Sequence, residues 1–89
     1  MKYAFRWDPA ARRELRDIPL TDARRILLAL TTLGDDPYIE GPDIRKLAGH
    51  DALYRLRVGR YRIVYTIDNG ALVILVVKVG WRRDVYRGL

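Results

Sequence analysis

The chain has 89 residues and a mass of 10.4 kDa, with 49% hydrophobic and 31% charged residues, which predicts one small globular domain over residues 1–89. The absence of cysteine excludes a disulfide framework, a thiolate metal site and a cysteine nucleophile. A single histidine, His50, disfavours histidine-based metal ligation and a Ser/His/Asp triad, so we expect no metal and no other cofactor.

The net charge of +6 arises in the C-terminal part of the chain. Residues 1–53 hold nine Lys/Arg and nine Asp/Glu, whereas residues 54–89 hold eight cations and two carboxylates. Fourteen of the seventeen cations are arginines, whose guanidinium groups form bidentate contacts with phosphate. This distribution predicts a polyanionic partner, with nucleic acid first and an acidic protein second; a role in solubility alone stays open.

The sequence shows no targeting or membrane-spanning segment. Residues 1–15 lack the apolar core of a signal peptide, and no stretch approaches the ~18 apolar residues that span a bilayer. We therefore expect the protein to act in the cytoplasm, without membrane contact.

The N-terminal pattern predicts a strand followed by a helix. Residues 2–7 alternate aromatic with polar or small side chains, which is the period of a half-buried strand. Asp8 and Pro9 then form an N-cap followed by a proline at the first helical position. This helix ends before Pro19, and its apolar stripe consists of Ala11, Leu15 and Ile18.

A second helix is predicted between Thr21, which can cap its N-terminus, and Gly34, which can end it. Its apolar stripe is wider and consists of Ala23, Ile26, Leu27, Leu30 and Leu33. Because the turn between the two helices is short, we expect an antiparallel helical hairpin.

A loop separates the helices from a predicted strand meander. Residues 34–43 are rich in turn formers, and residues 44–47 are a candidate for a short extended piece. Three stretches rich in Val, Ile, Leu and Tyr follow, at residues 53–58, 61–68 and 71–79. Gly59-Arg60 and Asn69-Gly70 predict two-residue hairpin turns between them.

The last strand differs from the others because it is almost entirely apolar. Residues 71–79 read ALVILVVKV, so we expect this strand to be central and covered on both faces. The order β-α-α-β-β-β predicts an α+β fold, with the helical hairpin packed on one face of a small, mainly antiparallel sheet.

The register of the first hairpin brings three arginines together. With Gly59-Arg60 as the turn, Arg57 lies opposite Arg62, and Arg55 projects from the same face. The other face, which we expect to pack against the helices, carries Tyr54, Leu56, Val58, Tyr61, Ile63 and Tyr65. Like charges opposite one another destabilise a strand pair, and an anion between them offsets this cost. A solvated arginine face remains the alternative.

The residues after the last strand can return to the same sheet face. This segment, Gly80 to Tyr86, contains Arg82 and a tyrosine hydroxyl. Trp81 can stack on a base, a contact worth ~1–3 kcal/mol, or it can cover the core as a lid.

The stretches YRLRVGRYRIVYTIDNG (54–70) and VGWRRDVYR (79–87), in this order, resemble the RelE/ParE superfamily of bacterial type II toxin–antitoxin toxins, and the RelE branch in particular. The resemblance covers nearly the whole chain. It implies a metal-independent endoribonuclease that cleaves mRNA in the ribosomal A site. It also implies a cognate antitoxin as partner, together with mRNA and the ribosome, and allows a higher-order toxin–antitoxin complex.

The resemblance further implies roles for individual residues. Arg55 and Arg57 would bind the substrate as electrostatic clamps, because arginine does not lose its proton at any relevant pH. Arg62 would bind the scissile phosphate, and Arg82 would stabilise the leaving 5′ oxygen. Tyr86 would be the general base, with neighbouring guanidiniums lowering its pKa from the ordinary value of about 10.

A ParE-like poison of DNA gyrase, acting through protein contacts without nuclease activity, has the same fold and is the alternative function. A basic nucleic-acid-binding module without activity is a third possibility. The retained arginines and Tyr86 favour RNA cleavage, because gyrase poisoning does not require them.

Overall fold

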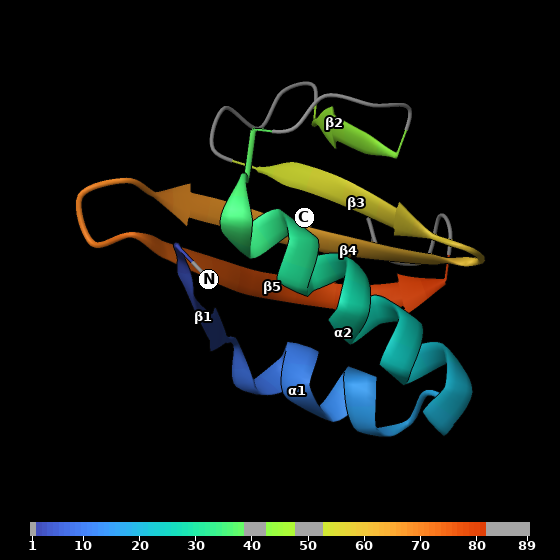
Figure 1. Cartoon of the computed structure of the whole chain (residues 1–89). Coiled ribbons are helices and arrows are strands. Elements are labelled where there is room, and N and C mark those ends of the chain that lie inside the picture. Colours follow the sequence, from blue (N-terminus) through green and yellow to red (C-terminus); the bar gives the residue numbers. More distant parts are fainter. Residues whose placement is uncertain (1, 39–42, 48–52, 82–89) are drawn as a thin grey trace.

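The computed structural model describes residues 2–38, 43–47 and 53–81, which form a sheet with one helix across a face and a second helix along an edge (Figure 1). The five strands of these residues have the spatial order β1-β5-β4-β3-β2. In chain order the elements are β1 (Ala4–Trp7), α1 (Pro9–Arg16), α2 (Leu20–Asp35), β2 (Ile44–Lys46), β3 (Tyr54–Val58), β4 (Tyr61–Asp68) and β5 (Val73–Trp81). The α+β fold with a mainly antiparallel sheet is therefore confirmed.

Both helices form where the apolar stripes predict them, but only α1 has the predicted cap. The Oδ1 atom of Asp8 accepts a hydrogen bond from the backbone N–H of Ala10 at 3.0 Å, and Pro9 occupies the first helical position. The predicted cap of α2 at Thr21 is wrong. This helix begins at Leu20 because Pro19, with φ −50°, already accepts the first helical hydrogen bond, from the N–H of Ala23 at 2.9 Å.

Gly34 lies inside the last turn of α2, so the prediction that it ends the helix is also wrong. The glycine is buried, and its carbonyl accepts a hydrogen bond from the N–H of Tyr3 at 2.9 Å. This contact joins the C-terminal end of α2 to the residues that precede β1.

The β3–β4 hairpin has the predicted register. Arg57 pairs with Arg62, and Leu56 pairs with Ile63. The turn is made by two residues, and the first of them, Gly59, has φ +57°, a conformation that glycine adopts without strain. Local turn chemistry therefore decides which residues of these two strands face each other.

The predicted two-residue turn at Asn69-Gly70 is wrong. Asp68 pairs with Val73, so four residues separate β4 from β5, and Leu72 adopts φ 54°. Asn69 is held by tertiary contacts instead, since its Oδ1 accepts from the Tyr3 hydroxyl and its Nδ2 donates to the Tyr38 hydroxyl, both at 2.7 Å. These hydrogen bonds link the residue before β1, the β4–β5 loop and the residues after α2.

The apolar strand β5 lies inside the sheet, between β1 and β4, as predicted. Strand β1 pairs with its first half in parallel, and α1 lies along the rest of that edge, where Glu14 Oε1 accepts from the backbone N–H of Val79 at 3.3 Å. The expectation that both faces of β5 are covered is wrong, because Leu75 is 36% exposed. A bulge at Val64/Tyr65 shifts the register, so that Val76 and Val79, three residues apart, both enter the core.

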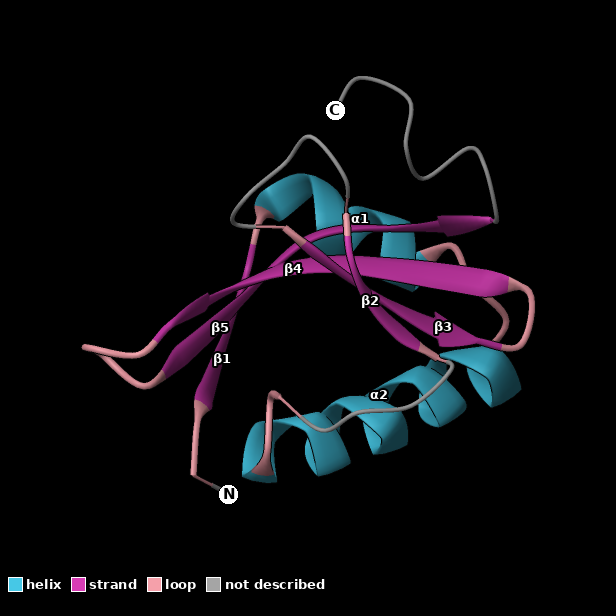
Figure 2. Cartoon of the chain, turned by 90° about the horizontal axis from the view of Figure 1, so that it is seen from above, coloured by secondary structure: helices cyan, strands magenta, loops and turns pink. Residues whose placement is uncertain are grey.

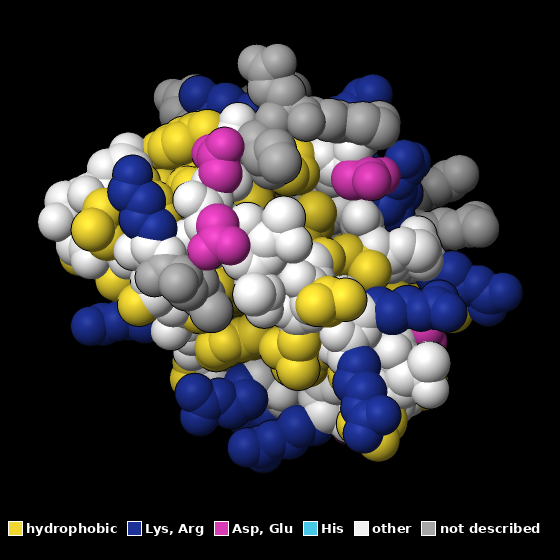
Figure 3. Space-filling view, viewed as in Figure 1, with side chains coloured by type: hydrophobic (Ala, Val, Ile, Leu, Met, Phe, Trp, Pro, Cys, Tyr) yellow, Lys and Arg dark blue, Asp and Glu magenta, His cyan; other side chains and the backbone are white. Residues whose placement is uncertain are grey.

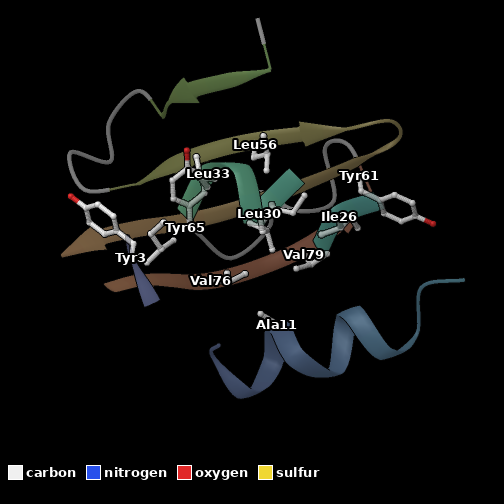
Figure 4. Packing of buried hydrophobic residues seen from close by; sticks show 12 residues of the cluster. Tyr3, Ala11, Ile26, Leu30, Leu33, Leu56, Tyr61, Tyr65, Val76 and Val79 are labelled. Carbon is white, nitrogen blue, oxygen red and sulfur yellow. The ribbon is translucent and has the colours of Figure 1, made fainter. Parts of the chain in front are cut away.

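Helix α2 lies across one face of the sheet, as both ribbon views show (Figures 1 and 2), and the core fills the space between them. Figure 4 shows the side chains of Ile26, Leu30 and Leu33 from α2 pointing toward the sheet. The strands contribute Leu56, Tyr61, Ile63, Tyr65, Ile74, Val76 and Val79, and α1 contributes Ala11. The predicted helix-facing side of the β3–β4 hairpin is thus confirmed.

We expect Tyr65→Phe to stabilise the protein by about 1 kcal/mol. Tyr65 is fully buried, and its hydroxyl has no hydrogen-bond partner among the described residues. Burial raises its pKa, with a further contribution from Tyr54 and a partial offset by Arg55. The unfolded chain therefore ionises first above about pH 10, and stability falls as the pH rises further. Denaturant unfolding at neutral and alkaline pH should show the gain and a flatter alkaline decline in the variant; an equal decline in both proteins would contradict this assignment.

Candidate nucleic-acid interface

Five cations of strands β2 to β5 lie on the side of the sheet that faces away from α2. Residues directly opposite one another on paired strands share a face of the sheet. The register pairs Arg45 with Arg55 and Arg57 with Arg62. Val64 of β4 pairs with Arg55 on one side and with Lys78 on the other. Leu56 and Ile63 alternate with these residues and lie in the core. We call this side of strands β2 to β5 the basic face, and its cations are Arg45, Arg55, Arg57, Arg62 and Lys78.

The cations of the basic face form two rows across the strands. One row crosses β3 and β4 with Arg57 and Arg62, and it continues to Gly80, which has no side chain. The other contains Arg45, Arg55 and Lys78. The rows lie two residues apart along β3, about 7 Å at the usual rise of a strand. The basic face therefore carries two neighbouring rows of cationic groups, one after the other along the strands.

The sequence-predicted arginines differ in how far they are exposed. Arg55 is only 8% exposed, and its Nε atom is buried, so it is not the solvated, splayed side chain of the alternative interpretation. Arg62 is half-buried, and its Nη1 atom lies 3.4 Å from the carbonyl oxygen of Tyr61. The hairpin therefore places Arg55, Arg57 and Arg62 on one face, as predicted, but it packs Arg55 down onto the sheet.

Arg57 has a carboxylate partner from its own chain. Asp43 Oδ1 accepts hydrogen bonds from Arg57 Nε at 3.0 Å and from Arg57 Nη2 at 2.8 Å. The two side chains are 42% and 55% exposed, so water screens the pair. Sequence analysis did not anticipate this ion pair, which offsets part of the charge of the basic face.

Trp81 lies on the other side of the sheet. It pairs with Tyr61, whose side chain belongs to the core layer, and the two rings meet edge to face with centroids 6.0 Å apart. The guanidinium of Arg60 lies 5.5 Å from the centre of the Trp81 ring, a cation–π contact. The structure therefore does not bring Trp81 together with the arginines of the basic face, and its geometry is that of a lid beside Tyr61.

Two hollows adjoin Trp81. One, of about 350 Å³, is lined in part by Asp22, Arg25 and Arg60, and the other, of about 450 Å³, by Glu14 and Asp17. Both contain carboxylates, so neither offers the purely cationic lining that a phosphate favours. The surface over α2, which Figure 3 shows, carries exposed hydrophobic side chains between separate charges, and Leu20 and Leu28 are the most exposed of these.

Two predicted catalytic residues, Arg82 and Tyr86, lie outside the described residues, as does His50. Within the described ranges, no group of three His, Cys, Asp or Glu side chains is placed to hold a metal ion. No described helix has the length and apolar character needed to span a bilayer.

Sequence reasoning missed Arg45 and Lys78 as members of the basic face. Arg45 is placed there by the pairing of β2 with β3. Lys78 is placed there by a bulge in β5, because Val77 has no partner in β4 and the alternation of side chains changes between Val76 and Lys78. Charge counting drew attention to the cations of residues 54–89, but register is required to assign them to a face.

Comparison with known proteins identifies a family. Residues 5–86 match the sequence model described as the ParE toxin of the type II toxin-antitoxin system, parDE. The chain is 34% identical over 93 residues to "Toxin RelG" of Mycobacterium tuberculosis, covering 98% of this chain and 99% of that protein. It is 27% identical over 88 residues to "Putative toxin RelE1" of Methanocaldococcus jannaschii, covering 98% of each.

Solved structures show the same relationship. The archaeal RelE-RelB complex from Pyrococcus horikoshii matches with a TM-score of 0.80 and 29% identity, over 93% of this chain and 98% of that chain. The intact E. coli RelBE toxin-antitoxin complex matches with a TM-score of 0.79 and 26% identity, over 91% and 98%. Together with the two-layer fold and the matched length, these findings show that the chain belongs to the RelE/ParE superfamily and is a toxin of the RelE kind from the type II toxin–antitoxin systems.

Proposed function

We propose that this toxin is an endoribonuclease that cleaves mRNA on the ribosome without a metal ion. The observation that carries the proposal is the basic face, where Arg57 and Arg62 lie directly opposite each other and Arg55 projects from the same side. Paired guanidiniums on one face match the two non-bridging oxygens of a phosphodiester, because each can donate two parallel hydrogen bonds.

The proposed reaction is transesterification within the RNA. The ribose 2′-OH attacks the adjacent phosphorus, the new O2′–P bond forms as the P–O5′ bond breaks, and the products are a 2′,3′-cyclic phosphate and a 5′-OH. The proton of the 2′-OH passes to a base, and the leaving 5′ oxygen receives a proton. Negative charge grows on the non-bridging oxygens in the transition state, where a preorganised cation stabilises it most.

Three arginines of the face have distinct parts in the proposal. Arg62, half-buried in the middle of the face, would bind the scissile phosphate directly. Arg57, which is exposed, would share that phosphate or hold the next one. Arg55 is nearly buried and would contribute its charge from beneath the bound anion. The family resemblance adds Arg82 for the leaving 5′ oxygen and Tyr86 as general base.

We extend the proposal to the partners of the toxin. The related proteins from P. horikoshii and E. coli were each solved as RelE-RelB or RelBE complexes. By analogy, a cognate antitoxin would bind this chain and cover the basic face, in a complex that can contain more than one copy of each protein. Co-expression with the product of the neighbouring reading frame should restore the growth that the toxin alone arrests; arrest that persists would argue against this partner.

Cell-free translation with primer extension tests the nuclease proposal. Purified toxin should produce discrete cleavage sites within the translated part of the mRNA. Cleavage should persist when the toxin is treated with EDTA and dialysed before it is added, because the proposed chemistry uses guanidinium groups in place of a metal. Loss of cleavage after that treatment, with recovery on adding a divalent cation, would contradict the metal-independent mechanism.

A ParE-like action on DNA gyrase is the second candidate, because the family model that matches is that of the ParE toxin. A supercoiling assay with purified gyrase separates the two. The nuclease proposal predicts normal supercoiling at toxin concentrations that cleave mRNA. Inhibition of supercoiling with intact mRNA would favour the gyrase alternative.

A further inference from the structure

We infer that Asp43 is an internal competitor for Arg57: in the free toxin its carboxylate occupies the guanidinium edge that an RNA phosphate must take over. The inference rests on the proposed function and adds a residue that sets how tightly the basic face holds RNA. It concerns a residue in the loop before β2, which the family resemblance did not single out.

The geometry of the pair supports competition. Arg57 points Nε and Nη2 at Asp43 Oδ1, at 3.0 and 2.8 Å. These two N–H groups form one edge of the guanidinium fork, which is the kind of edge that binds a phosphate bidentately. A carboxylate oxygen and a phosphate oxygen are chemically alike as acceptors, so both cannot use this edge at once.

The exposure of the pair makes the exchange possible. Arg57 and Asp43 are 42% and 55% exposed, and exposed ion pairs are weak and easily broken. A single anion gains little binding free energy by displacing Asp43, because the Asp43 carboxylate already binds the same edge of the Arg57 guanidinium. A phosphate that also contacts Arg62, directly across the hairpin, gains a second cation that Asp43 does not reach in the structure. The pair thus favours polyanions seated on the whole face over isolated anions.

The backbone keeps Asp43 in position independently of its charge. Its carbonyl oxygen accepts a hydrogen bond from the backbone N–H of Arg57 at 2.7 Å. Asn at this position would retain that hydrogen bond and would still offer a side-chain oxygen to the guanidinium. Asp43→Asn therefore removes the negative charge while preserving the local structure, which is what a test of competition requires.

The chain offers a matched control. Asp36 is exposed at the C-terminal end of α2, and its Oδ1 accepts one hydrogen bond, from the backbone N–H of Tyr38 at 3.1 Å. Asp36→Asn changes the net charge of the toxin by the same amount and also retains a side-chain acceptor. It lies in the helical layer rather than on the basic face, so it reports the effect of net charge alone.

The experiment measures binding of a short single-stranded RNA, methylated at every 2′-OH so that it is not cleaved, by fluorescence anisotropy between about 50 and 200 mM salt. We expect Asp43→Asn to bind about two- to fivefold more tightly than the wild type. The slope of log K against log salt should become steeper by about 0.7, because one more phosphate is neutralised. Asp36→Asn should leave the slope unchanged.

The outcomes separate this inference from the proposed function. If the wild type binds the RNA and Arg62→Ala weakens binding, but Asp43→Asn has the wild-type affinity and slope, the competition is wrong and the proposed function stands. Weaker binding by Asp43→Asn would also overturn it, because Asp43 would then position Arg57 for the phosphate. An equal gain in RNA affinity for Asp36→Asn would show that the effect comes from net charge, and the competition would be wrong. If neither the wild type nor Asp43→Asn binds the RNA, the competition is wrong, and the proposed function is then decided by the cell-free cleavage assay alone.

Discussion

Arg62→Ala is expected to lower the rate of mRNA cleavage about 100- to 1,000-fold, which is the usual effect of removing one preorganised donor from a developing oxyanion. Arg62 lies across the hairpin from Arg57 and beside the side-chain-free Gly80. Its hydrogen bond to the Tyr61 carbonyl is long, at 3.4 Å, so little of the fold depends on it. Primer extension in a cell-free translation reaction measures the loss.

Two readouts keep this prediction specific. The melting temperature of Arg62→Ala should equal or slightly exceed that of the wild type, because the substitution removes a like charge opposite Arg57. Arg60→Ala is the control, since Arg60 lies against the Trp81 ring, away from the basic face, and should cleave at nearly the wild-type rate. Undiminished cutting by Arg62→Ala would remove this residue from the site.

Leu33→Ala is expected to destabilise the fold by about 2–5 kcal/mol. Leu33 is fully buried between the C-terminal half of α2 and the sheet, in the core cluster that Figure 4 shows. Alanine would leave a cavity that the surrounding β3 and β4 side chains fill only in part. A loss of this size is a large share of the ~5–15 kcal/mol that holds a domain folded. Denaturant unfolding measures it.

The same helix provides the comparison. Leu28 is 71% exposed on the outer surface of α2, so Leu28→Ala should change the free energy of unfolding by less than about 0.5 kcal/mol. Similar losses for Leu33→Ala and Leu28→Ala would show that helix propensity, rather than burial against the sheet, governs the stability of α2.

Sequence patterns predicted the parts of the fold that depend on local chemistry. The Gly59-Arg60 turn specified the register of β3 and β4, and with it the juxtaposition of Arg57 and Arg62. The apolar stripe predicted which side of α2 enters the core, except that Leu27, which it included, is exposed. These features follow from residues that are close together in the chain. Tertiary contacts did not override the conformational preferences of these residues.

Other features depended on contacts between distant residues. Asn69 carries a strong hairpin signal, yet hydrogen bonds to Tyr3 and Tyr38 hold it in a longer loop. The bulge in β5 brought Lys78 onto the basic face, and nothing in the sequence of β5 marks its position. Trp81 falls on the core side because β5 extends two residues further than predicted and keeps its register with β4.

The Asp43–Arg57 pair is another feature of the candidate site that could not be predicted from the sequence, because it depends on a contact between distant residues. Asp43 belongs to a loop whose polar composition predicted only its loop conformation, and it lies 14 residues from its partner. Pairing of β2 with β3 brings the two together. The sequence indicated that Arg55, Arg57 and Arg62 share a face, whereas the structure was needed to show that Arg57 already has a counter-charge.

The most direct test of the account is the chemistry of the cut RNA, measured on a message with a 2′-deoxynucleotide at the mapped cleavage position. Guanidinium-assisted attack by the 2′-OH predicts that the all-ribose message yields fragments ending in 2′,3′-cyclic phosphate, and that the single 2′-deoxy substitution abolishes cleavage at that position. Continued cleavage of the substituted message, or fragments with a 5′-phosphate and a free 3′-OH, would contradict the mechanism assigned to the basic face.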